Sequence, residues 1–163
     1  MTILHNLKWA ECTYCGDSAS ALDHVTPYSW NSNRKRTNST YVNQDECVPC
    51  CSECNSITNT KVFFDIASKA AFIAGRLARR HRRYLEGGIW LEDDYQTIKG
   101  SGWGGEDFKP IEGRLEQSVR ARQSIRQMVI ERVRHANTIA GLQNLTISDV
   151  WKAYERGEQL IKT

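Results

Sequence analysis

The chain has 163 residues, of which 40% are hydrophobic and 25% are charged, and its formal net charge is +3. This length fits one domain of ordinary size, or a small domain with a helical appendage. No run of 18 apolar residues occurs, which argues against a membrane-spanning helix, and the first residues lack the pattern of a signal peptide. We therefore expect a cytoplasmic protein, whose six cysteines bind metal rather than form disulfides.

Charge is distributed unevenly along the chain. Residues 62–85 carry six basic side chains and one acidic one, whereas residues 86–112 carry seven acidic side chains and two basic ones. Such blocks suit a protein that places basic surface against phosphates. Solvated helix faces are the alternative for any single block, so charge alone does not decide the function.

The first third of the chain, residues 9–61, is rich in Cys, Asn, Ser and Thr, as expected where a metal replaces part of the core. Residues 20–26 predict a short strand that stops at a proline. After a polar loop over residues 28–44, residues 45–49 predict the second strand of a hairpin. A helix is expected to begin near Ser52.

The rest of the chain predicts three helices. Asp65 is a suitable N-cap for the first, which a Gly-Gly pair at 87–88 ends. An acidic, Gly-rich connector is expected over residues 89–112, a second long helix over residues 114–140, and a last helix opened by a capping box at residues 146–149. The apolar residues at helical spacing are Ile66, Ala70, Ile73, Leu77 and Tyr84 in the first helix, and Leu115, Val119, Ile125, Val129, Val133 and Ala136 in the second.

Two C-x-x-C pairs carry the strongest signal for a metal. Cys12 with Cys15, and Cys51 with Cys54, are two knuckles whose four thiolates complete a tetrahedral Cys₄ site. We predict one structural zinc ion per chain. A closed Cys₄ site leaves no open position for a substrate, so any chemistry must come from other residues.

A third pair, Cys47 and Cys50, directly precedes the second knuckle. Spacing alone does not separate the two choices. Pro49 and the strand pattern nevertheless favour Cys47 and Cys50 as small buried residues.

The residues around the knuckles resemble a known family. The stretch 22–27 (LDHVTP) lies between the knuckles, and the stretch 48–55 (VPCCSECN) contains the second one. In this order they resemble the HNH, or ββα-metal, endonucleases over residues 12–61. The basic stretch 74–84 and the Trp-acidic stretch 90–94 are similar to the continuation seen in phage-type members. The Cys₄ site, the final Asn and the helical second half also resemble the endonuclease VII branch.

The resemblance implies an α+β fold with four segments. These are a zinc-stapled ββα-metal module at 1–61, a basic helix packed on it at 62–88, an acidic Gly-rich connector at 89–112, and a helical C-terminal region at 113–163. A homodimer through the C-terminal helices is a further expectation.

The resemblance also implies a function, namely hydrolysis of DNA, double-stranded or branched, to 5′-phosphate and 3′-hydroxyl ends. His24 would be the general base. Asp23 and Asn55 would hold a catalytic Mg or Mn ion. Asn59, one helical turn after Asn55, would be a further ligand or a phosphate contact. The setting would be the cytoplasm of a bacterial or phage-infected cell.

Two features leave alternatives open. The middle Asn of the family motif falls on Asp45 or Glu46, with Asn43 just before, and a carboxylate cannot donate as an amide does. Strict pleating would also point Asp23 and His24 to opposite faces, so the strand must twist or end there. The alternative function is a non-catalytic, zinc-dependent module that binds nucleic acid or protein. In that case Asp23 is a turn residue, His24 a core residue and Asn55 a helix cap.

Five arginines in eight residues predict contact with phosphates. On a continuous helix Arg76, Arg80 and Arg83 share one face, flanked by Arg79 and Arg82. The arginines of the second long helix, in contrast, predict a solvated face; they are Arg120, Arg126, Arg132 and Arg134. No role is predicted for His5 or His135.

Overall fold

The chain has a mixed α/β fold, with a two-stranded sheet and a mostly helical second half. Its structure is a computed structural model, which describes residues 10–27, 46–59, 61–86, 97 and 109–161. Contacts divide the chain into two compact units: residues 1–77 together with 132–163, and residues 78–131. Each unit is described by itself.

Two short strands form the antiparallel sheet of the first unit. Strand β1 is Ala21–His24 and strand β2 is Cys47–Cys50, with Ala21 opposite Cys50 and His24 opposite Cys47. The two predicted strands therefore exist, although each is only four residues long. β1 ends at His24 and a bend follows, as expected just ahead of a proline.

Helix α1, Ser52–Thr58, begins directly after β2, close to its predicted start. Its N-cap is Cys51, whose Sγ accepts a hydrogen bond from the backbone N–H of Cys54 at 3.4 Å. The order along the chain is thus strand, strand, helix. One cysteine of the second knuckle therefore caps the helix that carries the other.

Helix α2, Ile66–Arg80, starts as predicted after Asp65. The Asp65 carboxylate accepts hydrogen bonds from the Ser68 backbone N–H at 2.7 Å and from its hydroxyl at 2.8 Å, and these lower the pKa of Asp65. The predicted apolar residues up to Leu77 are buried. A well-capped start and a buried stripe explain this helix without help from the metal.

The prediction of one helix running through Tyr84 was wrong. α2 ends at Arg80, and a separate short helix α3, Arg82–Leu85, follows a turn at His81. The Tyr84 N–H donates to the His81 carbonyl at 2.8 Å, a three-residue bond that tightens the chain at the helix end. The two helices therefore need not share a face.

Helix α5, Lys109–Gly141, covers the second predicted helix and begins earlier than expected. Helix α6, Ile147–Glu155, opens with the predicted capping box, in which Thr146 and Asp149 bond each other reciprocally. These bonds lower the pKa of Asp149. The chain leaves α6 through Gly157, whose φ of +63° favours glycine.

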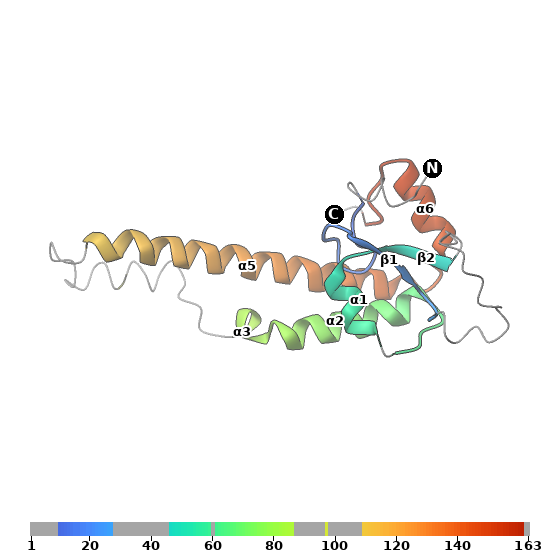
Figure 1. The fold of residues 1–163 in the computed structure, drawn as a ribbon, viewed down its shortest axis with the longest axis horizontal. Helices are drawn as coiled ribbons and strands as arrows, with labels where there is room; N and C mark the ends of the chain where they lie inside the picture. Colours follow the sequence, from blue (N-terminus) through green and yellow to red (C-terminus); the bar gives the residue numbers. More distant parts are fainter. Residues whose placement is uncertain (1–9, 28–45, 60, 87–96, 98–108, 162–163) are drawn as a thin grey trace. The chain divides into compact units, whose positions relative to one another are not determined.

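The hydrophobic core of the first unit joins the sheet, α1, the first part of α2, the end of α5 and α6 (Figure 1). Its large side chains include Tyr14, Ile73 and Ile139, each of which is 0% exposed. The Trp151 Nε1–H of α6 donates to the Cys47 carbonyl of β2 at 2.8 Å. This packing explains why all four residues of β2 are buried.

The second unit contains α3 and the first part of α5. Among its described residues Val119 and Val129 are buried, while Met128 and Ile130 are exposed. The predicted polar loop at 28–44 and, apart from residues 97 and 109–112, the predicted connector at 89–112 lie outside the described residues. No helix in the described part of the chain is both long enough and apolar enough to cross a membrane.

Candidate functional site

The structure brings both predicted cysteine knuckles together. The Sγ atoms of Cys12, Cys15, Cys51 and Cys54 all lie within 4.8 Å of one another, and all four residues are buried. The Sγ atoms of Cys15 and Cys51 are 3.7 Å apart, far beyond a disulfide bond. Zinc–sulfur bonds of about 2.3 Å in a tetrahedron would place neighbouring sulfurs about 3.8 Å apart. The cluster is therefore compatible with structural zinc.

The first knuckle is a tight turn that a glycine completes. The Gly16 N–H donates to the Cys12 carbonyl at 2.8 Å, and Gly16 has a φ of +73°. The residues before and after the turn are joined by the Ala19 N–H, which donates to the Ala10 carbonyl at 2.8 Å. A glycine permits this backbone conformation without strain, so both thiols of the turn point to one side.

The four thiols of the cluster strongly affect one another's protonation. The neighbouring thiols of Cys12, Cys15 and Cys54 donate to Cys51 and lower its pKa. The surrounding thiols and burial in turn raise the pKa of Cys54. A bound divalent cation would favour all four sulfurs as thiolates.

The competing pair, Cys47 and Cys50, does not belong to the cluster. Both residues are 0% exposed within β2, as predicted for small buried residues. The Cys50 Sγ donates to the Cys51 carbonyl at 3.3 Å. Of the two overlapping pairs, Cys51 and Cys54 are the ones whose sulfurs lie with those of Cys12 and Cys15.

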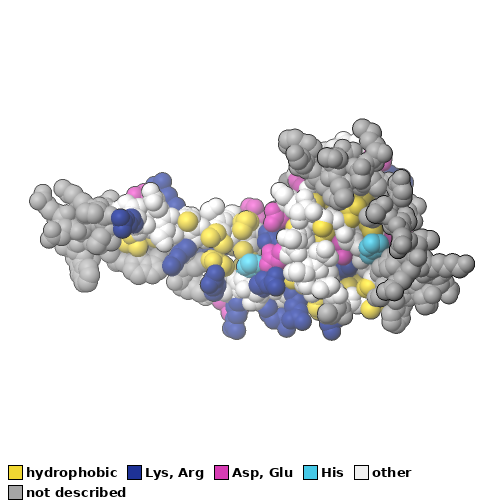
Figure 2. Space-filling view, viewed as in Figure 1, with side chains coloured by type: hydrophobic (Ala, Val, Ile, Leu, Met, Phe, Trp, Pro, Cys, Tyr) yellow, Lys and Arg dark blue, Asp and Glu magenta, His cyan; other side chains and the backbone are white. Residues whose placement is uncertain are grey.

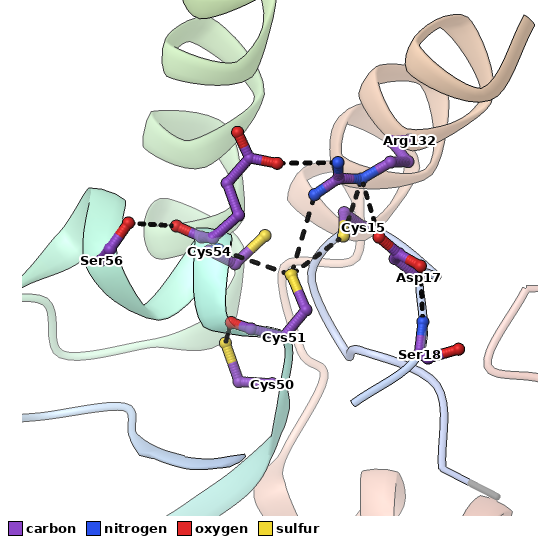
Figure 3. A network of polar contacts seen from close by, with 9 residues as sticks. Cys15, Asp17, Ser18, Cys50, Cys51, Cys54, Ser56 and Arg132 are labelled. Carbon is purple, nitrogen blue, oxygen red and sulfur yellow. Dashed lines mark hydrogen bonds and ion pairs between the residues drawn. The ribbon is translucent and has the colours of Figure 1, made fainter. Parts of the chain in front are cut away.

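Arg132 was predicted to lie on a solvated face, and that prediction was wrong. Its side chain is 9% exposed, and its guanidinium lies against the cysteine cluster (Figure 3). Burial acts to lower the pKa of Arg132, but hydrogen bonds and charge from Cys15 and Glu53 raise it overall. Arg120 and Arg134, in contrast, are exposed as expected.

Asp23 lies in β1 and is only 6% exposed. Its Oδ2 accepts a hydrogen bond from the Tyr14 hydroxyl at 2.7 Å and lies 2.7 Å from the Lys69 Nζ. Lys69 also donates to the backbone carbonyls of His24 at 2.8 Å and Val25 at 3.4 Å. Burial, followed by the charge of Asp23, raises the pKa of Tyr14. Two residues that the sequence did not single out, Tyr14 and Lys69, thus fix the end of β1.

His24 is the last residue of β1 and is partly exposed. The alternation of a buried Asp23 with a more exposed His24 follows the strand pleat, which places neighbouring side chains on opposite faces. The strand ends at His24, two residues before the end of the predicted strand at 20–26. The imidazole is therefore at a strand end and within reach of solvent.

The two candidate amides lie on α1 and its C-cap. Asn55 is partly buried in the first turn, and Asn59 is the exposed C-cap residue. Four residues apart, they share one face of the helix, and α1 contacts β1. Glu46, one candidate for the middle motif position, accepts the Val25 N–H at its carbonyl at 3.3 Å. Asn43 and Asp45 lie outside the described residues.

Asp23 and His24 do not belong to a described group of three or more potential metal ligands. Within the described ranges, the four cysteines are the only group of three or more His, Cys, Asp or Glu side chains placed to share an ion. Any cation on Asp23 would therefore need amide or water ligands in addition to the carboxylate.

The arginine-rich stretch is exposed, and Figure 2 shows basic side chains gathered where α2 lies. Arg76 and Arg80 lie four residues apart on α2, but the helix break puts Arg83 on α3, so the three arginines do not lie on the one continuous helix that was predicted. Arg82 pairs with Glu86, and the Arg83 guanidinium lies 4.7 Å from the Tyr84 ring centroid. Arg79 is also exposed.

His135, for which the sequence predicted no role, packs against the first knuckle. A Cβ atom on Gly16 would lie 2.8 Å from the His135 Nδ1. Burial lowers the pKa of His135. The knuckle turn thus requires glycine for two reasons, its positive φ and the neighbouring imidazole.

Comparison of the chain with protein-family models, curated proteins and solved structures finds no match.

Proposed function

We propose that this protein is a metal-dependent DNA endonuclease of the HNH type, stapled by zinc on Cys12, Cys15, Cys51 and Cys54. One observation carries the proposal. An Asp-His pair ends the first strand of a two-stranded antiparallel sheet, and the helix directly after the second strand carries an Asn in its first turn. The cysteine cluster ties that helix to the chain ahead of the sheet.

The proposed chemistry assigns a role to each residue. His24, partly exposed at the strand end, takes the proton of the attacking water. Asp23 and Asn55, with Asn59 as a further ligand, hold a Mg or Mn ion. When bound, this ion stabilises charge on the phosphate and on the leaving oxygen. Tyr14 and Lys69 fix the Asp23 carboxylate through Oδ2, so Oδ1 is the oxygen that serves the ion.

Cleavage of supercoiled plasmid tests the proposal directly. Wild-type protein is expected to nick or linearise plasmid with Mg²⁺ or Mn²⁺, and the zinc-loaded protein is expected to be inactive when neither ion is added. His24→Ala should cut at least about a hundredfold more slowly, as expected for loss of a general base, while its DNA affinity stays unchanged. His81→Ala is a matched control, because His81 lies in a turn between α2 and α3. Equal cleavage by wild type and His24→Ala would refute this assignment of the base.

A second prediction concerns DNA binding by the exposed arginines. Replacing Arg76 and Arg80 with Gln should weaken binding to all DNA sequences alike, because guanidinium groups on one helix face contact phosphates rather than bases. Each lost phosphate contact should flatten the slope of log K against log salt by about one unit. Fluorescence anisotropy over a salt series measures both. Arg120→Gln, which removes an exposed arginine of α5, is the control. An unchanged slope in the double variant would assign phosphate contact to other residues.

A non-catalytic binding module is the second candidate. Lys69 already places a positive charge on Asp23, which opposes a divalent cation at the same carboxylate. The same plasmid assay separates the candidates, because a binding module shifts DNA in a gel but leaves it intact with every metal.

A further inference from the structure

Arg132 reaches the cysteine cluster from a distant part of the chain. It lies on α5, within the first compact unit, and only 8% of the residue is exposed. A guanidinium group keeps its charge at all ordinary pH values, so burying it requires acceptors for its N–H groups. The neighbours of Arg132 therefore show what its charge is used for.

All three guanidinium nitrogens of Arg132 have partners, and two of the partners are knuckle sulfurs. Nε lies 3.4 Å from the Cys15 Sγ, and Nη2 lies 3.7 Å from the Cys51 Sγ. Nη1 pairs with the Glu53 carboxylate at 2.7 Å, and Nε lies 3.6 Å from the Asp17 carboxylate. Figure 3 shows the guanidinium between these groups.

The contacts are distributed evenly over the two knuckles. Cys15 and Asp17 belong to the first knuckle and the turn after it, whereas Cys51 and Glu53 belong to the second. One sulfur and one carboxylate are thus contacted on each side. The planar guanidinium holds its donors in a rigid fork, whereas a lysine carries its charge as a compact ammonium on a flexible stem.

The chemistry of a zinc–thiolate site gives these contacts a consequence. Four thiolates around Zn²⁺ carry a net charge of −2, and this charge makes the sulfurs nucleophilic and easily protonated. Charge-assisted N–H···S bonds from a buried guanidinium withdraw charge from the sulfurs. Partners outside the ligand shell commonly alter metal affinity by about 10–100-fold when they are removed.

We propose that Arg132 is the positioning residue of the metal centre: it clamps the two knuckles together and shields the Cys15 and Cys51 sulfurs from electrophiles. The inference rests on zinc occupying the cluster and not on nuclease activity. The zinc content of the wild-type protein is therefore measured first, and activity is no part of the test.

The test compares zinc retention in Arg132→Gln and Arg132→Lys with that of the wild type. Competition with a chromogenic zinc chelator should show an affinity about 10–100-fold lower in Arg132→Gln. Arg132→Lys keeps the charge but not the fork, and it should fall in between. Zinc release on addition of N-ethylmaleimide should be faster in both variants. Arg134→Gln removes an exposed arginine two residues away on the same helix and should behave as the wild type.

A spectroscopic measurement separates positioning from general stability. With Co²⁺ in place of zinc, loss of the N–H···S bonds should shift the sulfur-to-cobalt charge-transfer bands in Arg132→Lys, whereas a merely structural role leaves them in place. If Arg132→Gln does not fold, Arg132→Lys decides. Wild-type zinc affinity, N-ethylmaleimide sensitivity and cobalt bands in Arg132→Lys would overturn the proposal.

Discussion

Replacement of Cys54 by Ser is expected to unfold the first compact unit and to abolish stoichiometric zinc binding. Cys54 is 0% exposed, and the cluster joins the first knuckle to α1 across the sheet. Structural zinc contributes on the order of 10 kcal/mol of apparent folding free energy, whereas a whole domain is stable by only about 5–15 kcal/mol. One lost ligand therefore removes a large share of the stability.

Cys47→Ala is the matched control for this prediction. Cys47 is equally buried but lies outside the cluster, so the change leaves a small cavity costing about 1–2 kcal/mol and keeps one zinc ion per chain. Elemental analysis gives the zinc content, and circular dichroism under reducing conditions gives the folded fraction. Soluble, folded wild-type protein without zinc would contradict the assignment of the metal.

The choice between overlapping cysteine pairs was predictable because two signals agreed. Cys47 and Cys50 lie in a strand-like stretch, and the other pair matches the family pattern in the stretch 48–55 (VPCCSECN). The structure shows the physical basis: Cys51 is the N-cap of α1, so its sulfur accepts a backbone N–H of the first turn. A thiol at a helix start is well placed to become a thiolate.

Lys69 and Arg132 were missed because hydrophobic periodicity counts only apolar residues. Lys69 follows the buried Ile66 by three positions, and Arg132 follows the buried Val129 by three. Each therefore stands on the apolar stripe of its helix. A basic residue within such a stripe signals a buried acidic or thiolate partner, but the sequence does not say which. Asp23, the partner of Lys69, is 46 residues away along the chain, and Cys15, a partner of Arg132, is 117 residues away.

The helix break at His81 also lay beyond the reach of the sequence. Arg, His and Tyr do not break helices strongly, and no Gly or Pro stands between Ile73 and Tyr84 other than Gly75. Just after the break, the Tyr84 N–H donates to the His81 carbonyl three residues earlier. Hydrogen bonds of this 3₁₀ type, between residues three apart at a helix end, depend on conformation rather than composition.

Lys69→Met is expected to destabilise the protein by about 3–5 kcal/mol, because it leaves the buried Asp23 carboxylate without its counter-ion. The two side chains are 3% and 7% exposed, so water cannot take the place of the ammonium. Tyr14 alone would then donate to Oδ2. Chemical denaturation measures the loss. Lys152→Met removes an exposed lysine of α6 and should change stability by less than about 0.5 kcal/mol.

Combination with Asp23→Asn shows whether the effect arises from this ion pair. The double variant should be more stable than the sum of the two single losses implies, by more than about 1 kcal/mol, since the two groups are in direct contact. Mg²⁺ or Mn²⁺ should also raise the melting temperature of Lys69→Met more than that of the wild type, because a divalent cation on Asp23 would replace the missing charge. Additive losses in the cycle would show that Lys69 acts through the His24 and Val25 carbonyls instead. Equal metal-induced shifts in both proteins would show that Asp23 does not hold the cation of the proposed nuclease.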